Sequence, residues 1–166
     1  MAVTRFQVEL SIAAAVVVLD QIVKAIVRST FELHESVVVI PSFFSLTRVH
    51  NYGAAFGLMN AAEFPFKTVV LSIVATLALG ALSWYGATLP VEQRLARLGL
   101  ALIIGGAAGN LMDRLRSGYV VDFVDLYWRD WHFWAFNVAD AAITVGVSLM
   151  ILDLLQIGRH RVSRAV

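Results

Sequence analysis

Four apolar segments, each close to the length of a membrane-spanning helix, dominate this sequence. They cover residues 10–27, 66–87, 95–112 and 138–157, and a helix needs about 20 mainly apolar residues to cross the hydrocarbon core of a bilayer. Of the 166 residues, 59% are hydrophobic and 15% are charged, which leaves too few polar side chains to cover a water-soluble fold. The chain, residues 1–166, is therefore predicted to be a single integral membrane domain of the all-α class with four transmembrane helices.

Charge and cysteine content exclude several classes of function. The net charge is +1 and Lys and Arg do not cluster, so the basic surface that nucleic-acid binding requires is absent. The chain contains no cysteine, which excludes a thiol nucleophile, thiolate metal ligands and a lipid on its own cysteine. The first apolar segment carries Asp20, Lys24 and Arg28 and has no convincing small-residue cleavage site, so we expect a retained helix rather than a cleaved signal peptide.

The arrangement of the spans predicts the topology. Four spans place both termini on one side of the membrane. The short segments at 90–94 and 159–161 carry arginine, as cytoplasmic segments tend to do. We therefore expect cytoplasmic termini and two longer outer segments, at 28–65 and 113–137.

The two outer segments differ in pattern. Residues 36–40 and 43–47 are rich in β-branched and aromatic side chains and are separated by Pro41 and Ser42, which predicts a hairpin in a small outer β-sheet. Residues 115–136 hold three of the four tryptophans, a composition typical of an aromatic belt at the membrane interface. Anchoring in the headgroup region accounts for most of these rings better than contact with a substrate.

Polar residues inside or beside the spans are functional candidates, because a charge at the bilayer centre costs about 2.5–3.5 kcal/mol on insertion scales. With four spans, the outer ends of the first and third spans and the start of the fourth lie at similar depth. Polar residues from separate parts of the chain are therefore predicted to meet near the outer boundary. They are Asp20, Lys24, Asn51, Asn110, Asp113, Arg114, Asp122, Asn137 and Asp140.

Structural roles would account for some of these residues. Asp20 and Lys24 are spaced i,i+4 and fit an ion pair that makes both tolerable within the membrane. Asn137 and Asp140 occupy the N-cap and N3 positions of a capping box at the start of the fourth span. Taken alone, these spacings favour scaffolding and capping over catalysis.

The end of the third span combines charges with small residues. Asp113 and Arg114 form a boundary cluster, in which Arg114 fits a contact with loop backbone or with a carboxylate. The run at 105–109 contains only Gly and Ala, which let membrane helices approach closely. The same smooth surface would also admit a substrate helix.

The available side chains favour carboxylate chemistry. His34 and Glu35 begin like a zinc-protease helix, but Val38 stands where the second histidine belongs, so no metal site and no other cofactor is predicted. There is no Gly-x-Ser-x-Gly nucleophile motif. Two carboxyl groups held about 3 Å apart share one proton, and such a pair hydrolyses peptides without a metal. Spacing alone does not select between Asp113 and Asp122 as members of the pair.

Five sequence blocks, spread from the first span to the fourth, match one family in order. They are Asp-Gln-Ile-Val-Lys at 20–24, Asn-Tyr-Gly-Ala-Ala-Phe at 51–56, Gly-Gly-Ala-Ala-Gly-Asn-Leu-Met-Asp-Arg at 105–114, Val-Asp-Phe at 121–123 and Phe-Asn-Val-Ala-Asp at 136–140. Together they resemble the signature blocks of the bacterial lipoprotein signal peptidases (signal peptidase II), a family of integral membrane aspartic peptidases. The chain length and the number of spans agree with this resemblance.

The resemblance implies an aspartic endopeptidase of the bacterial inner membrane, with its site near the periplasmic face. Such an enzyme removes the signal peptide from a prolipoprotein, cleaving before a cysteine that carries diacylglycerol. By the same resemblance, Asp122 and Asp140 are the catalytic pair. The residues implied to shape the site or bind substrate are Asn51, Gly106, Asn110, Arg114, Asn137 and Ala139, and those implied to support it are Asp20, Lys24 and Asp113.

The resemblance also implies a mobile element and partners. The stretch after Asn51, through Gly57, Leu58 and Met59, resembles the family's outer flap, a short periplasmic helix over the groove. The expected partners are a lipidated prolipoprotein, membrane lipid and, as an inhibitor, a cyclic peptide antibiotic. The protein is expected to act as a monomer.

Two other functions are compatible with the residues alone. Carboxylates and a lysine within spans also suit a small proton- or ion-coupled transporter, although four spans without an inverted repeat argue against it. A scaffold whose charges only hold helices together would leave the pairing of Asp122 and Asp140 unexplained.

Overall fold

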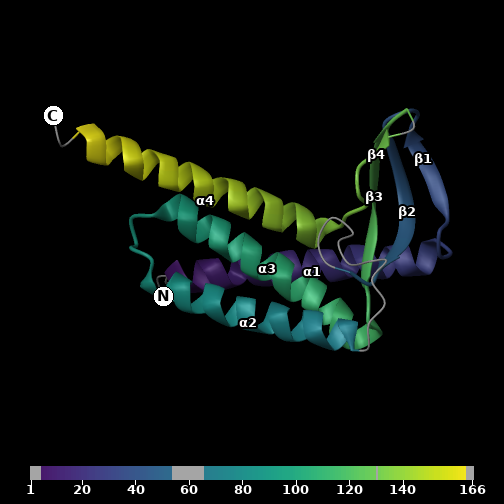
Figure 1. Cartoon of the computed structure of the whole chain (residues 1–166), viewed down its shortest axis with the longest axis horizontal. Helices are drawn as coiled ribbons and strands as arrows, with labels where there is room; N and C mark the ends of the chain where they lie inside the picture. The colour runs from purple at the N-terminus through teal and green to yellow at the C-terminus, as the bar shows by residue number, and fades with distance from the viewer. Residues whose placement is uncertain (1–4, 54–65, 130, 164–166) are drawn as a thin grey trace.

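The structure, a computed structural model, is a bundle of four helices with a sheet across one end, and it describes residues 5–53, 66–129 and 131–163. The helices are α1 (Arg5–Thr30), α2 (Lys67–Thr88), α3 (Arg94–Ser117) and α4 (Val138–Ser163). They run along the long axis of the molecule, and the strands run crosswise to them (Figure 1). The start of α1 and the end of α4 lie at the end remote from the sheet (Figure 1).

All four helices are long and apolar enough to cross a membrane, as predicted. Several of them extend beyond the predicted apolar segments. α3 in particular continues past residue 112 to Ser117, so Asp113 and Arg114 lie on its last turns. It ends where Gly118 adopts a φ of 81°, a left-handed conformation that suits glycine, and the Gly118 N–H donates to the Arg114 carbonyl oxygen at 3.0 Å.

α3 is the central helix and packs against α1, α2 and α4. Glycines permit this close approach. A Cβ on Gly105 would lie 2.7 Å from the carbonyl oxygen of Ala13 in α1, and a Cβ on Gly106 would collide with the carbonyl oxygen of Ala139 in α4. The prediction that residues 105–109 serve helix packing is therefore confirmed.

Four antiparallel strands form the sheet, in the order β1 (Ser36–Ile40), β2 (Phe44–Asn51), β3 (Val120–Trp128) and β4 (Trp131–His132). The predicted hairpin is confirmed as β1 and β2, although β2 extends beyond residue 47 to Asn51. The segment 115–136 was predicted only as an aromatic belt, and it also contributes β3 and β4. Because β3 pairs with β2, the sheet joins the two outer segments.

The burial of β3 explains why sequence patterning missed this strand. Val120, Val121 and Phe123 are all buried, so successive side chains on both faces of the strand are covered. Val121 and Phe123 pack in one apolar cluster with Val27 of α1. A strand covered on both faces lacks the alternation of apolar and polar residues that identifies a half-exposed strand.

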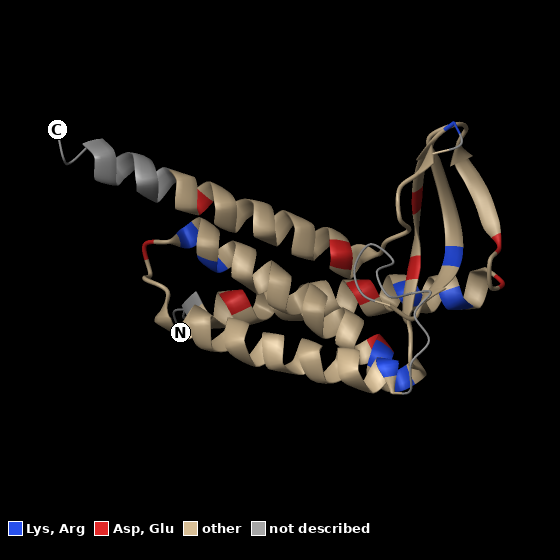
Figure 2. Ribbon diagram, in the orientation of Figure 1, with Lys and Arg blue, Asp and Glu red and all other residues tan. Residues whose placement is uncertain are grey.

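Acidic and basic residues lie toward the two ends of the helices, with uncharged stretches between them (Figure 2). At the sheet end they include residues of all four helices and of β2 and β3. The predicted flap after Asn51 falls outside the residues that the structure describes.

Candidate active site

The two aspartates of the predicted pair lie on different elements and are linked by one asparagine. Asp122 is on β3, and Asp140 is in the first turn of α4. The Asn137 amide nitrogen donates to Asp122 Oδ1 at 2.6 Å, and the Asn137 Oδ1 accepts from the Asp140 N–H at 3.0 Å. The Asn137 N–H in turn donates to Asp140 Oδ2 at 3.3 Å. This reciprocal pair of bonds confirms the predicted capping box.

Two further asparagines each donate to one of the aspartates. Asn51, the last residue of β2, donates from Nδ2 to Asp122 Oδ2 at 3.0 Å. Asn110 of α3 donates from Nδ2 to Asp140 Oδ1 at 2.8 Å. Three side-chain amides, from β2, from α3 and from the residue before α4, therefore each donate a hydrogen bond to one of the two carboxylates.

Three buried charged side chains, those of Asp20, Lys24 and Asp113, form a cluster that is connected to Asp140. Lys24 Nζ lies 2.8 Å from Asp20 Oδ2 and 3.0 Å from Asp113 Oδ2, and all three side chains are fully buried. The predicted ion pair of Asp20 and Lys24 is confirmed, and Asp113 joins it. Lys24 also donates to Asn110 Oδ1 at 2.9 Å, which connects the charge cluster to Asp140.

Two residues of this cluster were not predicted as site residues. Arg28 donates to Asp113 Oδ1 at 2.7 Å. The Gln21 amide nitrogen lies 3.2 Å from Asp20 Oδ2 and 3.3 Å from Asp113 Oδ1. A signal for both was present in the sequence, because residues 21, 24 and 28 are spaced to share one face of a helix.

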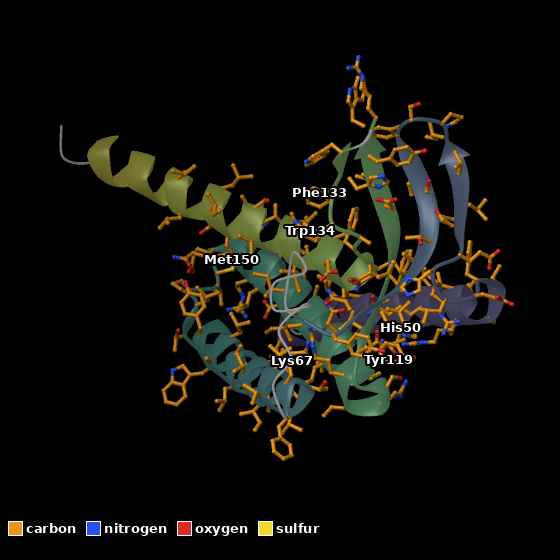
Figure 3. The ribbon with its side chains drawn as sticks, turned by 45° about the vertical axis from the view of Figure 1, so that its right-hand side comes forward. His50, Lys67, Tyr119, Phe133, Trp134 and Met150 are labelled. Carbon is orange, nitrogen blue, oxygen red and sulfur yellow. The ribbon has the colours of Figure 1, made fainter. Side chains whose placement is uncertain are left out.

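Arg114 holds the chain where it leaves β2. Its Nη2 donates to the carbonyl oxygen of Gly53 at 2.9 Å, which confirms the predicted contact with loop backbone. The side chain of Asn51 accepts from the Gly53 N–H at 2.9 Å. The His50 ring stacks on Tyr119 with a centroid distance of 3.7 Å (Figure 3). These contacts position Asn51 beside Asp122.

The surroundings of Asp122 favour a carboxyl group that keeps its proton. Burial, and to a lesser extent the nearby charge of Asp140, raises the pKa of Asp122 to about 7. The hydrogen bonds from Asn51 and Asn137, and the charge of Lys24, act in the opposite direction. A pKa near 7 is suited to proton transfer at neutral pH.

An apolar cavity of about 680 Å³ lies between α2, α3, α4 and the segment that follows β4. Its apolar walls include Leu71 and Val74 of α2 and Ile143 of α4. Phe133 and Trp134, which also line it, lie between the sheet and α4 (Figure 3). The polar side chains of the site that line it are Asn51, Asn110, Arg114 and Asp140. The arrangement brings a carboxylate and amide donors to the wall of an apolar groove.

Gly106 of α3 and Ala139 of α4 pack against each other. Both are buried, and they form a close contact between α3 and α4 next to Asp140. The Ala139 N–H donates to Asp20 Oδ1 at 3.0 Å. These contacts help to place α4.

Among the side chains of residues 6–53, 66–129 and 131–155, no three from His, Cys, Asp or Glu gather as metal ligands would. The four aspartates of the site are instead engaged by Lys24, Arg28 and amide donors.

Comparison with known proteins decides the family. The family model described as Signal peptidase (SPase) II matches residues 12–156. The chain belongs to the signal peptidase II family. The lipoprotein signal peptidase of Syntrophotalea carbinolica is 42% identical over 164 residues, covering 97% of this chain and 99% of the relative. That of Geobacter metallireducens is 42% identical over 150 residues, covering 90% and 91%.

Solved structures agree with this assignment. A bacterial membrane enzyme solved by the in meso method at 2.3 Å resolution has a TM-score of 0.80 and 33% identity, covering 90% of this chain and 88% of that chain. A second, solved by the same method at 1.9 Å, has a TM-score of 0.79 and 32% identity, covering 89% and 92%. Membership of the signal peptidase II family makes the chain a membrane peptidase, and the transporter alternative has no support.

Proposed function

We propose that this protein is an aspartic endopeptidase that removes the signal peptide from diacylglyceryl-modified prolipoproteins, cleaving before the lipidated cysteine. The observation that carries the proposal is the link through Asn137 between Asp122 and Asp140, of which Asp140 lines an apolar cavity. The relatives named above are lipoprotein signal peptidases, which supports the choice of substrate.

The two aspartates act as an acid and a base that share one proton. The ionised carboxylate takes a proton from a water molecule as the water oxygen attacks the scissile carbonyl carbon. The protonated carboxyl group donates to the carbonyl oxygen. When the tetrahedral intermediate collapses, the C–N bond breaks and the carboxyl group that took a proton from water gives it to the cysteine nitrogen, which leaves as an amine. The other carboxylate takes back the proton from an oxygen of the intermediate, and the signal peptide leaves with a new carboxyl group. The pair returns to its singly protonated state.

The surrounding amides keep this chemistry oriented. Asn137, Asn110 and Asn51 donate to the aspartates and hold each carboxylate in one position. Arg114 holds the backbone at Gly53, next to the segment in which the flap is predicted. We assign Asn51, Asn110, Arg114 and Asn137 to shaping the site, Gly106 and Ala139 to placing α4, and Asp20, Lys24 and Asp113 to supporting it.

The cavity suits a substrate that stays in the membrane. A signal peptide is an apolar helix, and the precursor also carries acyl chains, so an apolar groove between helices receives it without extraction from lipid. We place the sheet end of the bundle at the periplasmic face of the bacterial inner membrane and both termini in the cytoplasm. A cyclic peptide antibiotic would compete for the same groove, and the enzyme acts as a monomer that needs no cofactor.

The test is proteolysis by the purified full-length protein in detergent, followed by gel mobility of a diacylated precursor and its unlipidated form. We expect cleavage of the diacylated form, and a loss of about 10²–10⁴-fold in kcat for Asp122→Asn and for Asp140→Asn, because each removes half of the acid and base pair. Near-normal turnover in either variant would exclude that residue from catalysis.

Asp125 of β3 provides a matched control. It lies on the same strand as Asp122 but bonds His132 at 3.0 Å on the outer part of the sheet. Asp125→Asn is expected to retain full activity. EDTA is expected to have no effect, and inhibition that added metal reverses would point to a metal-dependent mechanism.

A further inference from the structure

The two segments that carry the aspartates are anchored in the same way. The N–H of Val121, the residue before Asp122, donates to Asp113 Oδ2 at 3.1 Å. The N–H of Ala139, the residue before Asp140, donates to Asp20 Oδ1 at 3.0 Å. Each aspartate therefore follows directly after a backbone amide that is held by a buried carboxylate from another element.

Both anchoring carboxylates bind the same ammonium group. Lys24 Nζ lies 2.8 Å from Asp20 Oδ2 and 3.0 Å from Asp113 Oδ2. Its third acceptor is Asn110 Oδ1, at 2.9 Å. An ammonium group has three N–H donors, and these three acceptors use all of them.

The third bond also determines how Asn110 presents its amide. Because Oδ1 of Asn110 faces the donors of Lys24 and Asn137, its Nδ2 faces Asp140 and donates to it. A rotation of this amide by 180° would place an oxygen against the carboxylate of Asp140, which is repulsive when that carboxylate is ionised.

We propose that Lys24 is the positioning residue of the catalytic pair: through Asp113 and Asp20 it sets the placement of β3 relative to α4, and through Asn110 it orients a donor onto Asp140. This inference rests on the proposed role of Asp122 and Asp140 as that pair. It assigns Lys24 a function in catalysis that helix packing alone would not require.

The energetics of burial support a positioning role. Lys24, Asp20 and Asp113 are fully buried, and burying ions costs desolvation energy that their attraction often only offsets. Buried ion pairs are therefore weak stabilising devices. They do hold groups in a defined geometry, and an error of about 1 Å in such a geometry can cost about 100-fold in rate.

The charges of the cluster permit a balanced variant. Asp20, Lys24, Asp113 and Arg28 carry two negative and two positive charges in contact. The double variant Asp20→Asn with Lys24→Met removes one of each, and Asn at position 20 can still accept from the Ala139 N–H. The bonds from residue 24 to Asp113 and Asn110 are lost.

The experiment measures kcat, KM and melting temperature of this double variant with the diacylated precursor in detergent. We expect kcat to fall by about 100-fold while KM changes by less than about threefold, because substrate contacts with the cavity remain and the pair is misplaced. A kcat within twofold of the parent protein, in a folded variant, would overturn the proposal.

Glu9 and Arg97 provide a matched control. They form another ion pair between α1 and α3, with bonds of 2.5 and 2.8 Å, at the end of the bundle remote from the sheet. Glu9→Gln with Arg97→Met also removes one charge of each sign, and it is expected to lower the melting temperature without changing kcat. An equal loss of kcat in this control would show a general effect of helix packing and overturn the role of Lys24.

A conservative variant completes the test. Asp20→Asn with Lys24→Gln keeps the charge balance and restores an N–H donor at residue 24, so we expect its kcat to lie between those of the Met variant and the parent. If the Met variant does not fold, this variant carries the test, and a kcat equal to that of the parent would overturn the proposal. If Asp122→Asn and Asp140→Asn lose activity but the Lys24 double variants keep full activity, the role of Lys24 is refuted and the catalytic pair is not. If Asp122→Asn and Asp140→Asn keep activity, the assignment of Asp122 and Asp140 as the catalytic pair is refuted.

Discussion

The contact between α3 and α4 is built with glycine at both ends of the bundle, but the two ends have different surroundings. Near the sheet, a Cβ on Gly106 would collide with the Ala139 carbonyl oxygen and lie 2.8 Å from Ile143 Cγ1. At the remote end, a Cβ on Gly99 would collide with the Gly146 carbonyl oxygen and lie 3.0 Å from Met150 Cγ. The backbones approach closely in both places.

The two contacts differ in whether a buried charged side chain is hydrogen-bonded to them. Ala139 also donates to Asp20 and precedes Asp140, so the contact at the sheet end places an aspartate of the site. The contact around Gly146 is surrounded by apolar side chains such as Met150 and Ile103. Close packing of α3 against α4 is thus found at both ends of the bundle. At the sheet end, the buried charged side chains also position the carboxylates of the site.

The largest expected contrast comes from adding one methyl group at each end. Gly106→Ala would displace the turn of α4 that carries Asp140, and we expect a loss of about 100-fold in kcat. Gly99→Ala would cost a similar amount of stability, about 1–3 kcal/mol, because it overpacks the same pair of helices. Its kcat should stay within about threefold of the parent. Melting curves and turnover of both variants check this, and equal losses of kcat would show that the two ends are not functionally distinct.

A smaller contrast is expected between the starts of two helices. Asn137 caps α4 and bonds Asp122, so Asn137→Ala should lower kcat by about 10- to 100-fold and cost about 1 kcal/mol of stability. Gln93 precedes α3 at the other end and makes no capping bond with its side chain. Gln93→Ala should therefore leave both quantities unchanged. Asn137→Ala with undiminished kcat would mean that the link between the aspartates is dispensable.

The smallest expected effect is a shift in pH dependence. The hydrogen bond from Asn51 lowers the pKa of Asp122, so Asn51→Ala should raise that pKa. The singly protonated pair loses its last proton at higher pH in the variant, and the basic limb of the kcat profile should therefore move to higher pH. Thr47→Val, on the same strand but bonded to the Glu35 carbonyl oxygen, is the control. A basic limb that moves to lower pH, or stays in place, would contradict the assignment.

Local patterns predicted much of the fold and part of the site. The four spans, the i,i+4 pair of Asp20 and Lys24, and the capping box of Asn137 and Asp140 each depend on residues within a few turns of one another. Helix geometry relates such residues directly, so their spacing is sufficient to predict the contact.

Residue spacing did not decide which aspartates form the catalytic pair, and the resemblance to the signal peptidase II family implied that choice. Residue types and topology brought several carboxylates to one end of the molecule, without selecting Asp122 over Asp113. The structure gives them different surroundings: Asp113 is paired with Lys24 and Arg28, whereas Asp122 accepts hydrogen bonds from Asn51 and Asn137. Of these two carboxyl groups, Asp122 is therefore the one to which no cation of the described residues is bound directly.

Sequence by itself determined the membrane-spanning helices, the hairpin and the group of polar residues near one end, because hydrophobic length and short-range spacing are properties of neighbouring residues. The tertiary structure decided which partners those residues have. The bond between Ala139 and Asp20 joins positions 119 residues apart, and the bond between Lys24 and Asn110 joins positions 86 apart. Such contacts follow from how α1, α3, α4 and β3 pack together, and no local spacing encodes that packing.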